Sequence, residues 1–166
     1  YHFGIRHFID LTEEGELRPY NHLLPKDTTY TRFPIVDCGA PKSIDSVHRL
    51  MLRIEELKKM DGYVYVHCWG GVGRTGTIVA CYLSQNRDES DLNHTLEVLR
   101  RNFSKMPKSA YRETPETKVQ IDFIEQFINA SKSYKEEKSK RVADCIRGSL
   151  IAGAAGDALG YEVEFM

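Results

Sequence analysis

The stretch from residue 63 to residue 85 joins a strand to a helix through a glycine-rich loop. The run Tyr63-Val64-Tyr65-Val66-His67 is mostly β-branched or aromatic, which predicts a short strand in the middle of a sheet. Residues 75–85 return to the apolar spacing of a helix. Three of the four residues 70–73 are glycine, so this loop can adopt backbone angles that other residues avoid.

The rest of the chain continues this alternation. Residues 5–11 predict a buried strand and residues 32–36 a short extended segment. Helices are predicted over 43–60 and 90–103, and from Pro115 onward. Strands and helices at such short intervals indicate an α/β fold, a sheet with helices on its faces. The 43–60 helix has one apolar face, made of Ile44, Val47, Leu50, Met51, Ile54 and Leu57.

The charge balance excludes several classes of partner. Lys plus Arg number 23 and Asp plus Glu number 24, a formal net charge of −1. A chain so balanced lacks the net positive charge that attracts nucleic acid or an anionic membrane, so we expect neither as a partner. No apolar run approaches the roughly 18 residues of a membrane span. The four cysteines lack metal-type pairing, which favours a metal-free protein of the reducing cytoplasm.

The glycine-rich loop has the composition of an anion site with a nucleophile in it. Cys68 follows the strand directly, and Arg74 comes six residues later. Successive backbone N–H groups in such a loop form a nest for phosphate or sulfate, and the next helix adds its positive end. The same field lowers the pKa of a thiol, and an arginine fork can hold two phosphate oxygens. These features predict phosphoryl transfer to sulfur. The predicted phosphate-binding residues are Trp69, Gly70, Gly71, Val72, Gly73 and Arg74.

The run His67-Cys68, five residues, then Arg74-Thr75-Gly76 resembles the signature of the cysteine-dependent protein tyrosine phosphatases. The compact size is similar to the dual-specificity branch, and the resemblance covers roughly residues 4–130. It implies a central, mostly parallel sheet of four or five strands flanked by helices. It also implies hydrolysis of a phosphorylated protein or peptide, with phosphotyrosine the expected residue. No cofactor is needed, because side chains supply every group.

The resemblance assigns roles to individual side chains. Cys68 is the nucleophile that forms a phosphocysteine, and Arg74 binds the phosphate and its transition state. Thr75 stabilises the leaving thiolate in the second step, and His67 orients the loop. The family's general acid lies on a mobile loop about thirty residues before the nucleophile. Asp37 in Phe33-Pro34-Ile35-Val36-Asp37 matches that placement.

Some positions allow an alternative reading. Asp37 could merely cap its loop, and Asp10 is the second candidate for the acid. Downstream, Gln120 lies in a segment that resembles one near the active site of small phosphatases, where it would position water. Against that role, Thr114 as N-cap with Pro115 at the first helical position explains most of the pattern. A reversible disulfide between Cys38 and Cys68 is conceivable.

The loop composition bears on the substrate. Lipid phosphatases of this superfamily resemble the present loop but place lysines where this chain has Trp69 and Val72. Only Arg74 is cationic within the loop, which favours a phosphoprotein over a phosphoinositide. Four cations outside the loop could add charge: Arg32, Lys42, Lys108 and Arg112.

The composition changes near the charged run 135–141, and we expect a phosphatase domain over residues 1–136 whose first elements lie outside this chain. Residues 137–166 would be a linker and the truncated start of another domain. Residues 147–165, with the run Gly156-Asp157-Ala158-Leu159-Gly160, resemble the first helix of the ADP-ribosylglycohydrolases, where Glu164 falls at a catalytic acidic position. The alternatives are thus a fragment of a bifunctional protein, which here should lack glycohydrolase activity, and a non-catalytic phosphate-binding module.

Overall fold

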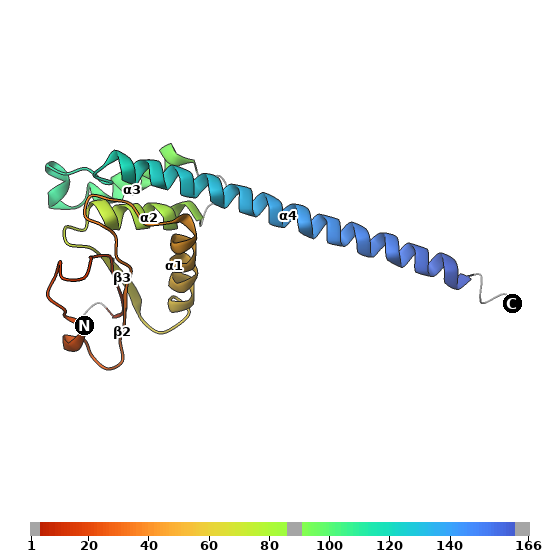
Figure 1. Ribbon diagram of the computed structural model, residues 1–166, viewed down its shortest axis with the longest axis horizontal. Coiled ribbons are helices and arrows are strands. Elements are labelled where there is room, and N and C mark those ends of the chain that lie inside the picture. The colour runs from red at the N-terminus through yellow and green to blue at the C-terminus, as the bar shows by residue number, and fades with distance from the viewer. Residues whose placement is uncertain (1–3, 86–90, 162–166) are drawn as a thin grey trace. The chain divides into compact units, whose positions relative to one another are not determined.

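A computed structural model describes residues 4–85 and 91–161 of the chain. The chain forms two compact units, residues 1–128 and 129–166. All the strands and the helices up to α3 belong to the first unit (Figure 1). The elements in chain order are β1 (Ile5–Asp10), a 3₁₀ turn η1 (Asn21–Leu23), β2 (Thr29–Arg32), α1 (Ile44–Leu57), β3 (Tyr63–His67), α2 (Gly73–Gln85), α3 (Leu92–Phe103), η2 (Pro107–Ala110) and α4 (Lys118–Tyr161).

The sheet is parallel throughout but smaller than predicted. Its order is β2-β1-β3, so the described residues contain three strands instead of four or five. Every element that follows β3 in the described residues is helical, so no further strand is added there. The prediction that the 63–67 strand lies in the middle is wrong, because β1 takes that place. The carboxyl ends of β1 and β3 lie side by side, with Asp10 opposite His67.

The second strand lies slightly earlier than the predicted extended segment. β2 spans Thr29–Arg32, and the chain beyond it is irregular. Phe33 and Ile35 nevertheless donate their backbone N–H groups to Asp10 and Leu11, at 2.8 and 3.0 Å. These two hydrogen bonds hold residues 33–35 beside the end of β1, so the chain reaches Asp37 close to that end of the sheet.

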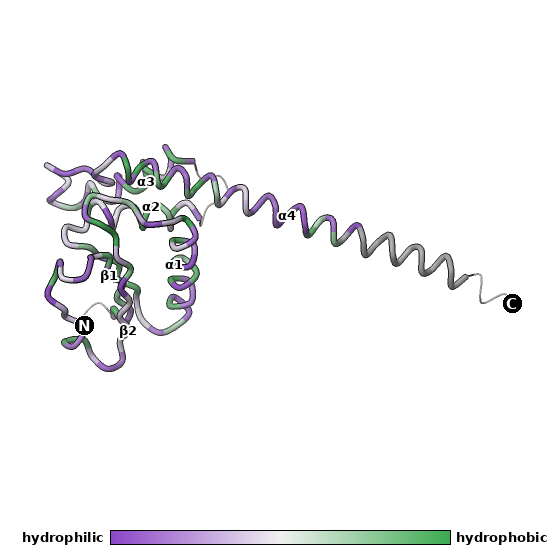
Figure 2. Tube along the Cα trace, viewed as in Figure 1, coloured by the Kyte–Doolittle hydropathy of each residue, from purple (hydrophilic) through white to green (hydrophobic). Residues whose placement is uncertain are grey.

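Helix α1 confirms the predicted apolar face. Ser43 caps its first turn by accepting the N–H of Ser46, and five of the six predicted core residues are buried. Figure 2 shows the resulting change between hydrophobic and hydrophilic positions along α1. The buried core of the first unit is formed by β1, β3 and the helices; its fully buried members include Ile9, Leu11, Leu57, Ile78, Ile124 and Phe127.

Helix α4 begins later than its sequence suggests. It starts at Lys118, so Thr114 and Pro115 precede it and the predicted Thr114 cap is wrong. Thr114 instead donates its hydroxyl to the carbonyl oxygen of Val72 at 2.8 Å. The buried face of α4 includes Gln120, Phe123 and Phe127.

The second unit consists of the later part of α4. The charged run Lys135–Arg141 is helical and exposed, and Figure 2 shows its hydrophilic character. Glu164, which the glycohydrolase resemblance singled out, lies outside the described residues. None of the helices in the described ranges is both long and apolar enough to cross a bilayer.

Candidate active site

The loop between β3 and α2 places the Cys68 sulfur among hydrogen-bond donors. Gly71 donates its backbone N–H to Sγ at 3.2 Å, and Thr75 donates its hydroxyl at 3.1 Å. Gly71 has φ +66°, a left-handed conformation that favours glycine and turns its amide toward the sulfur. The cysteine is only 7% exposed, while Trp69 beside it is 68% exposed. The loop therefore has a buried reactive centre and an aromatic rim.

These donors decide the ionisation of the thiol. Burial alone would raise the pKa of Cys68, since it penalises the charged form. The hydrogen bond from the Thr75 hydroxyl, with the backbone N–H groups of Thr75, Gly71 and Val72, outweighs that penalty and lowers the pKa below its ordinary value. A lowered pKa raises the share of the thiolate at a given pH, and the thiolate is the nucleophilic form of a cysteine.

A partly buried polar network supports the loop from the sheet side. The His67 Nδ1–H donates to the Cys68 carbonyl oxygen at 3.1 Å, so in the neutral ring Nε2 accepts the hydroxyl of Tyr20. Tyr20 packs edge to face on Tyr30, whose hydroxyl donates to Asp10 at 2.6 Å. This chain of contacts fixes the ring orientation of His67 next to Cys68.

Asp10 is a structural residue in this network. Its carboxylate is fully buried at the end of β1 and accepts the backbone N–H and the hydroxyl of Thr12, at 2.9 and 2.7 Å. Burial raises its pKa, but the hydrogen bonds from Thr12 and Tyr30 outweigh it and the net shift is downward. An acid must be protonated to donate, so these contacts oppose the alternative role of Asp10 as general acid.

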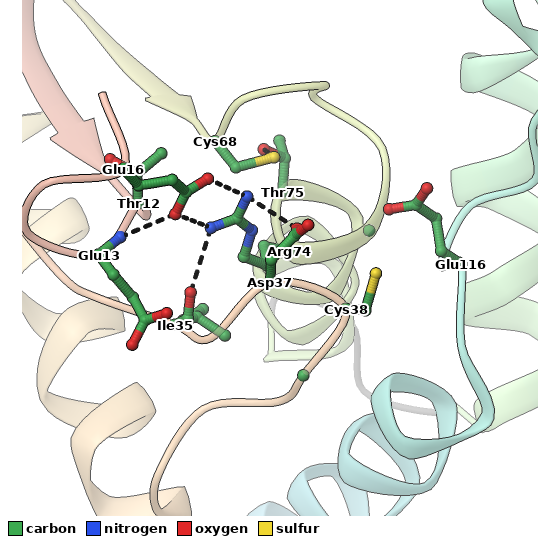
Figure 3. A network of polar contacts seen from close by, with 12 residues as sticks. Thr12, Glu13, Glu16, Ile35, Asp37, Cys38, Cys68, Arg74, Thr75 and Glu116 are labelled. Atoms are coloured by element: carbon green, nitrogen blue, oxygen red, sulfur yellow. Dashed lines mark hydrogen bonds and ion pairs between the residues drawn. The ribbon is translucent and has the colours of Figure 1, made fainter. Parts of the chain in front are cut away.

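Arg74 lies at the centre of the site and is held from three sides (Figure 3). Its Nη1 and Nη2 donate to the two carboxylate oxygens of Glu16, each at 2.6 Å. Nη1 also donates to the carbonyl oxygen of Ile35 at 3.2 Å, and Nη2 forms an ion pair with Asp37 at 2.9 Å. The guanidinium is only 2% exposed. The structure thus brings Asp37, Cys68 and Arg74, three predicted site residues, into one site.

The Asp37 loop is exposed but anchored by the start of α4. Asp37 is 69% exposed, and the next residue, Cys38, has φ 58°. Thr117 donates its hydroxyl to the Cys38 carbonyl oxygen at 3.0 Å, and Gln120 donates its Nε2 to that of Gly39 at 3.1 Å. Cys38 and Cys68 are both free thiols.

Gln120 is fully buried, and its amide spans three segments. Besides its bond to Gly39, its Oε1 accepts the backbone N–H groups of Glu116 and Thr117 at 2.9 and 3.3 Å. A Cβ added at Gly73 would lie 2.8 Å from Nε2, so the amide also touches the start of α2. Gln120 therefore ties the loop that carries Asp37 to the start of α2, directly after the glycine-rich loop.

The four cations outside the loop differ in what they contact. Lys108, on η2, donates Nζ to the Gly70 carbonyl oxygen at 2.5 Å, so it contacts the loop directly. Arg32 pairs with Asp10, and Arg112 pairs with Glu116. Lys42 is exposed at the start of α1. Within residues 4–85 and 91–161, no three His, Cys, Asp or Glu side chains cluster in a way that could hold a metal ion.

Two residues of this site were missed by sequence reasoning: Glu16 and Tyr20. Both lie between β1 and β2, and each contacts the strand–loop–helix unit across 47 to 58 residues of sequence. No local pattern indicates such contacts. The available signal was indirect, since a loop that follows the middle strand of a parallel sheet ends near the loop that follows its neighbour.

The comparisons with known proteins agree with this geometry. Residues 1–124 match the family described as the DSP-PTPase phosphatase domain of Swiss Army Knife proteins. The chain therefore belongs to the dual-specificity branch of the cysteine-dependent protein phosphatases. The crystal structure of Tk-PTP in its active form has 28% identical residues and a TM-score of 0.65, and the match covers 76% of this chain and 80% of that one. Kinase-associated phosphatase, at 22% identity and a TM-score of 0.60 over 78% of this chain and 71% of that one, shares the fold.

Two viral proteins named as tyrosine phosphatases are also similar. Protein 067L of Invertebrate iridescent virus 3 is 30% identical over 136 residues, which is 75% of this chain and 54% of that protein. Protein 197R of Invertebrate iridescent virus 6 is 30% identical over 173 residues, 95% of this chain and 58% of that protein. The chain thus spans somewhat more than half the length of these relatives.

Proposed function

We propose that this chain hydrolyses phosphomonoesters on proteins through a phosphocysteine at Cys68. One observation carries the proposal: a buried sulfur accepts two hydrogen bonds within a loop that also presents Arg74. Those donors stabilise the thiolate, and the backbone amides and the guanidinium match the charge of a phosphate dianion. No cofactor takes part, and the need for a reduced thiol favours the cytoplasm.

In the first step the Cys68 thiolate attacks phosphorus and the ester P–O bond breaks. Arg74 and the loop amides bind the equatorial oxygens, whose charge is greatest in the transition state. Asp37 donates its proton to the leaving oxygen, which departs as an alcohol. The exposed position of Asp37, paired with the arginine that binds the phosphate, supports this role.

In the second step a water molecule attacks the phosphocysteine and the P–S bond breaks. The water gives its proton to the Asp37 carboxylate, and the sulfur leaves as a thiolate that the Thr75 hydroxyl stabilises. Inorganic phosphate and the starting enzyme are the products. Within the described residues, Gln120 donates one of its two amide N–H groups to Gly39, and the other would orient the water. His67 holds the loop through its bond to the Cys68 carbonyl.

The proposed substrate is a phosphotyrosyl protein. Of the four cations near the loop, only Lys108 touches it, and two of the others are occupied by carboxylates. A phosphoinositide with several phosphates would find one additional charge, whereas the exposed Trp69 offers an aromatic surface to a peptide.

The test is hydrolysis of p-nitrophenyl phosphate by the chain and by Cys68→Ser, with and without a chelator. The proposal expects chelator-resistant turnover that Cys68→Ser abolishes. A folded wild-type chain that binds phosphate without turnover would instead establish the non-catalytic binding module. Phosphotyrosyl peptides and phosphoinositides are compared in the same assay, and faster turnover of the lipid would overturn the substrate assignment.

We also propose that residues 147–165 are the start of an ADP-ribosylglycohydrolase-like segment, on the strength of the Gly-Asp-Ala-Leu-Gly run. The phosphatase chemistry does not depend on this assignment. Because the segment is short, the chain should not hydrolyse ADP-ribosylated arginine, and measurable hydrolysis would refute that expectation.

A further inference from the structure

We propose that Thr117 is a positioning residue that holds the turn carrying Asp37 in place for proton transfer, an inference that rests on the proposed function. Thr117 directly precedes α4. Its hydroxyl donates to the Cys38 carbonyl oxygen at 3.0 Å, and the same oxygen accepts the backbone N–H of Gln120 at 3.3 Å. One hydroxyl thereby caps α4 and joins the turn to it.

The acid turn, residues 36–39, has little else to hold its shape. It is closed by a hydrogen bond from the Gly39 N–H to the Val36 carbonyl oxygen at 2.9 Å. Val36 and Asp37 are 56% and 69% exposed, and Cys38 is exposed as well, so side-chain packing contributes little. Cys38 has φ 58°, a left-handed conformation that favours glycine. Hydrogen bonds from outside the acid turn therefore keep it in this conformation.

Substrate binding changes which of these contacts remain. Within residues 4–85 and 91–161, three polar contacts join the acid turn to other elements: the ion pair of Asp37 with Arg74, the Thr117 hydrogen bond, and the bond from Gln120 to the Gly39 carbonyl oxygen. A bound phosphate needs the guanidinium of Arg74, so it competes with the ion pair. During proton transfer the acid turn is then held by Thr117 and Gln120 from α4.

Thr117 is the more informative of these two residues to change. Gln120 is fully buried, lies against the start of α2 and is proposed to orient water, so its removal would have several effects. In the part of the chain that the structure describes, the Thr117 hydroxyl makes hydrogen bonds only to the acid turn and to the first turn of α4. Thr117→Val keeps the shape of the side chain and removes both bonds. Thr117→Ser keeps the hydroxyl.

Thr117→Val should release the acid turn and make Asp37 a poorer proton donor. We expect kcat for phenyl phosphate to fall about five- to tenfold, the effect of one lost hydrogen bond. The fall for p-nitrophenyl phosphate should be only about twofold, because p-nitrophenolate leaves with little help from an acid. KM should change little, since Arg74 and the loop amides are untouched. Thr117→Ser should follow wild type.

The decisive measurement repeats Thr117→Val in an Asp37→Asn background. No acid is left to position there, so kcat for phenyl phosphate should not fall further. Asp91→Ala is the control for the loss of a helix cap, because Asp91 caps α3 by accepting the N–H of His94 at 2.7 Å. It should leave both rates unchanged. Should Thr117→Val fail to fold, Thr117→Asp replaces it, since a carboxylate can cap α4 but has no proton to donate to Cys38.

Two kinetic results would overturn the inference. Equal losses on the two substrates, or the same loss in the Asp37→Asn background, would show that Thr117 does not act through the acid.

Hydrogen exchange of the Gly39 amide tests the same contact without turnover. This amide closes the acid turn, so it should exchange about fivefold faster in Thr117→Val, and at the wild-type rate in Thr117→Ser. If the wild-type chain hydrolyses no substrate, the proposed function fails. Faster exchange would then still support the role of Thr117 in holding the acid turn, and unchanged exchange would refute it.

Discussion

The Thr75 hydroxyl donates to the Cys68 sulfur at 3.1 Å, from the first turn of the helix that follows the loop. This bond is the largest favourable contribution to the lowered pKa of Cys68. Thr75→Val keeps the shape of the side chain and removes the donor, so the pKa of Cys68 should rise. Loss of one hydrogen bond to a charged group should also slow release of the thiolate by about tenfold or more.

The pH dependence of Cys68 alkylation by iodoacetamide measures this effect. The pKa of Cys68 is lowered in the folded chain because the Thr75 hydroxyl stabilises the thiolate. The midpoint of the Thr75→Val profile should therefore move to higher pH. Thr75→Ser retains the hydroxyl and should follow wild type. An unchanged midpoint in Thr75→Val would show that the backbone N–H groups alone stabilise the thiolate.

Asp37→Asn should remove general acid catalysis, while Arg74 keeps its hydrogen bonds to Glu16 and Ile35. We expect kcat to fall by about 10²-fold, with loss of its decline at high pH. The defect should be larger for phenyl phosphate than for p-nitrophenyl phosphate, because the poorer leaving group needs the proton more. Asp45→Asn, at the exposed start of α1, is the matched control. Equal defects on both substrates would assign Asp37 a role other than proton transfer.

Gly76 permits the close approach of Thr114 to the loop. A Cβ there would lie 2.1 Å from Thr114 Oγ1, which donates to the Val72 carbonyl oxygen. Gly76→Ala should displace this buried hydroxyl and lower the free energy of unfolding by about 1–3 kcal/mol. At Gly70 the nearest atom to an added Cβ is 3.8 Å away, so Gly70→Ala should be far milder in urea unfolding. Comparable losses would contradict the steric account.

Lys108 should favour substrates with an acidic residue next to the phosphotyrosine. Its Nζ sits on the Gly70 carbonyl oxygen and has no carboxylate partner in the described ranges. Lys108→Ala should lower kcat/KM for an acidic phosphopeptide about two- to fivefold, as for an exposed ion pair, and salt should weaken the difference. p-Nitrophenyl phosphate should be hydrolysed normally. Lys105→Ala, whose ammonium binds Asn102, is the control. Equal losses on neutral and acidic peptides would refute this selectivity.

The strand, the loop and the helix from 63 to 85 could be predicted because their signals are local. Val66 and its neighbours show strand composition, the glycines mark the loop, and Cys68 and Arg74 are close in sequence. The lowered pKa of Cys68 also followed from the loop alone, since its donors come from the same stretch.

Features that depend on distant segments could not be predicted. The Glu16–Arg74 pair requires the parallel pairing of β1 with β3, which no short-range pattern reports. Thr114 has the sequence context of an N-cap, but its hydroxyl binds the Val72 carbonyl 42 residues away. The strand count was too high because the expectation came from the family and not from segments visible in this chain.

The most direct test of the central claim is to trap the phosphoryl group on Cys68. Wild-type chain is mixed with a phosphotyrosyl peptide, quenched rapidly in denaturant and digested for mass spectrometry. The account predicts one phosphoryl group on the peptide that contains Cys68, with a larger steady-state fraction in Gln120→Ala. Turnover without any phosphoryl group on Cys68, or with the group on another residue, would contradict it.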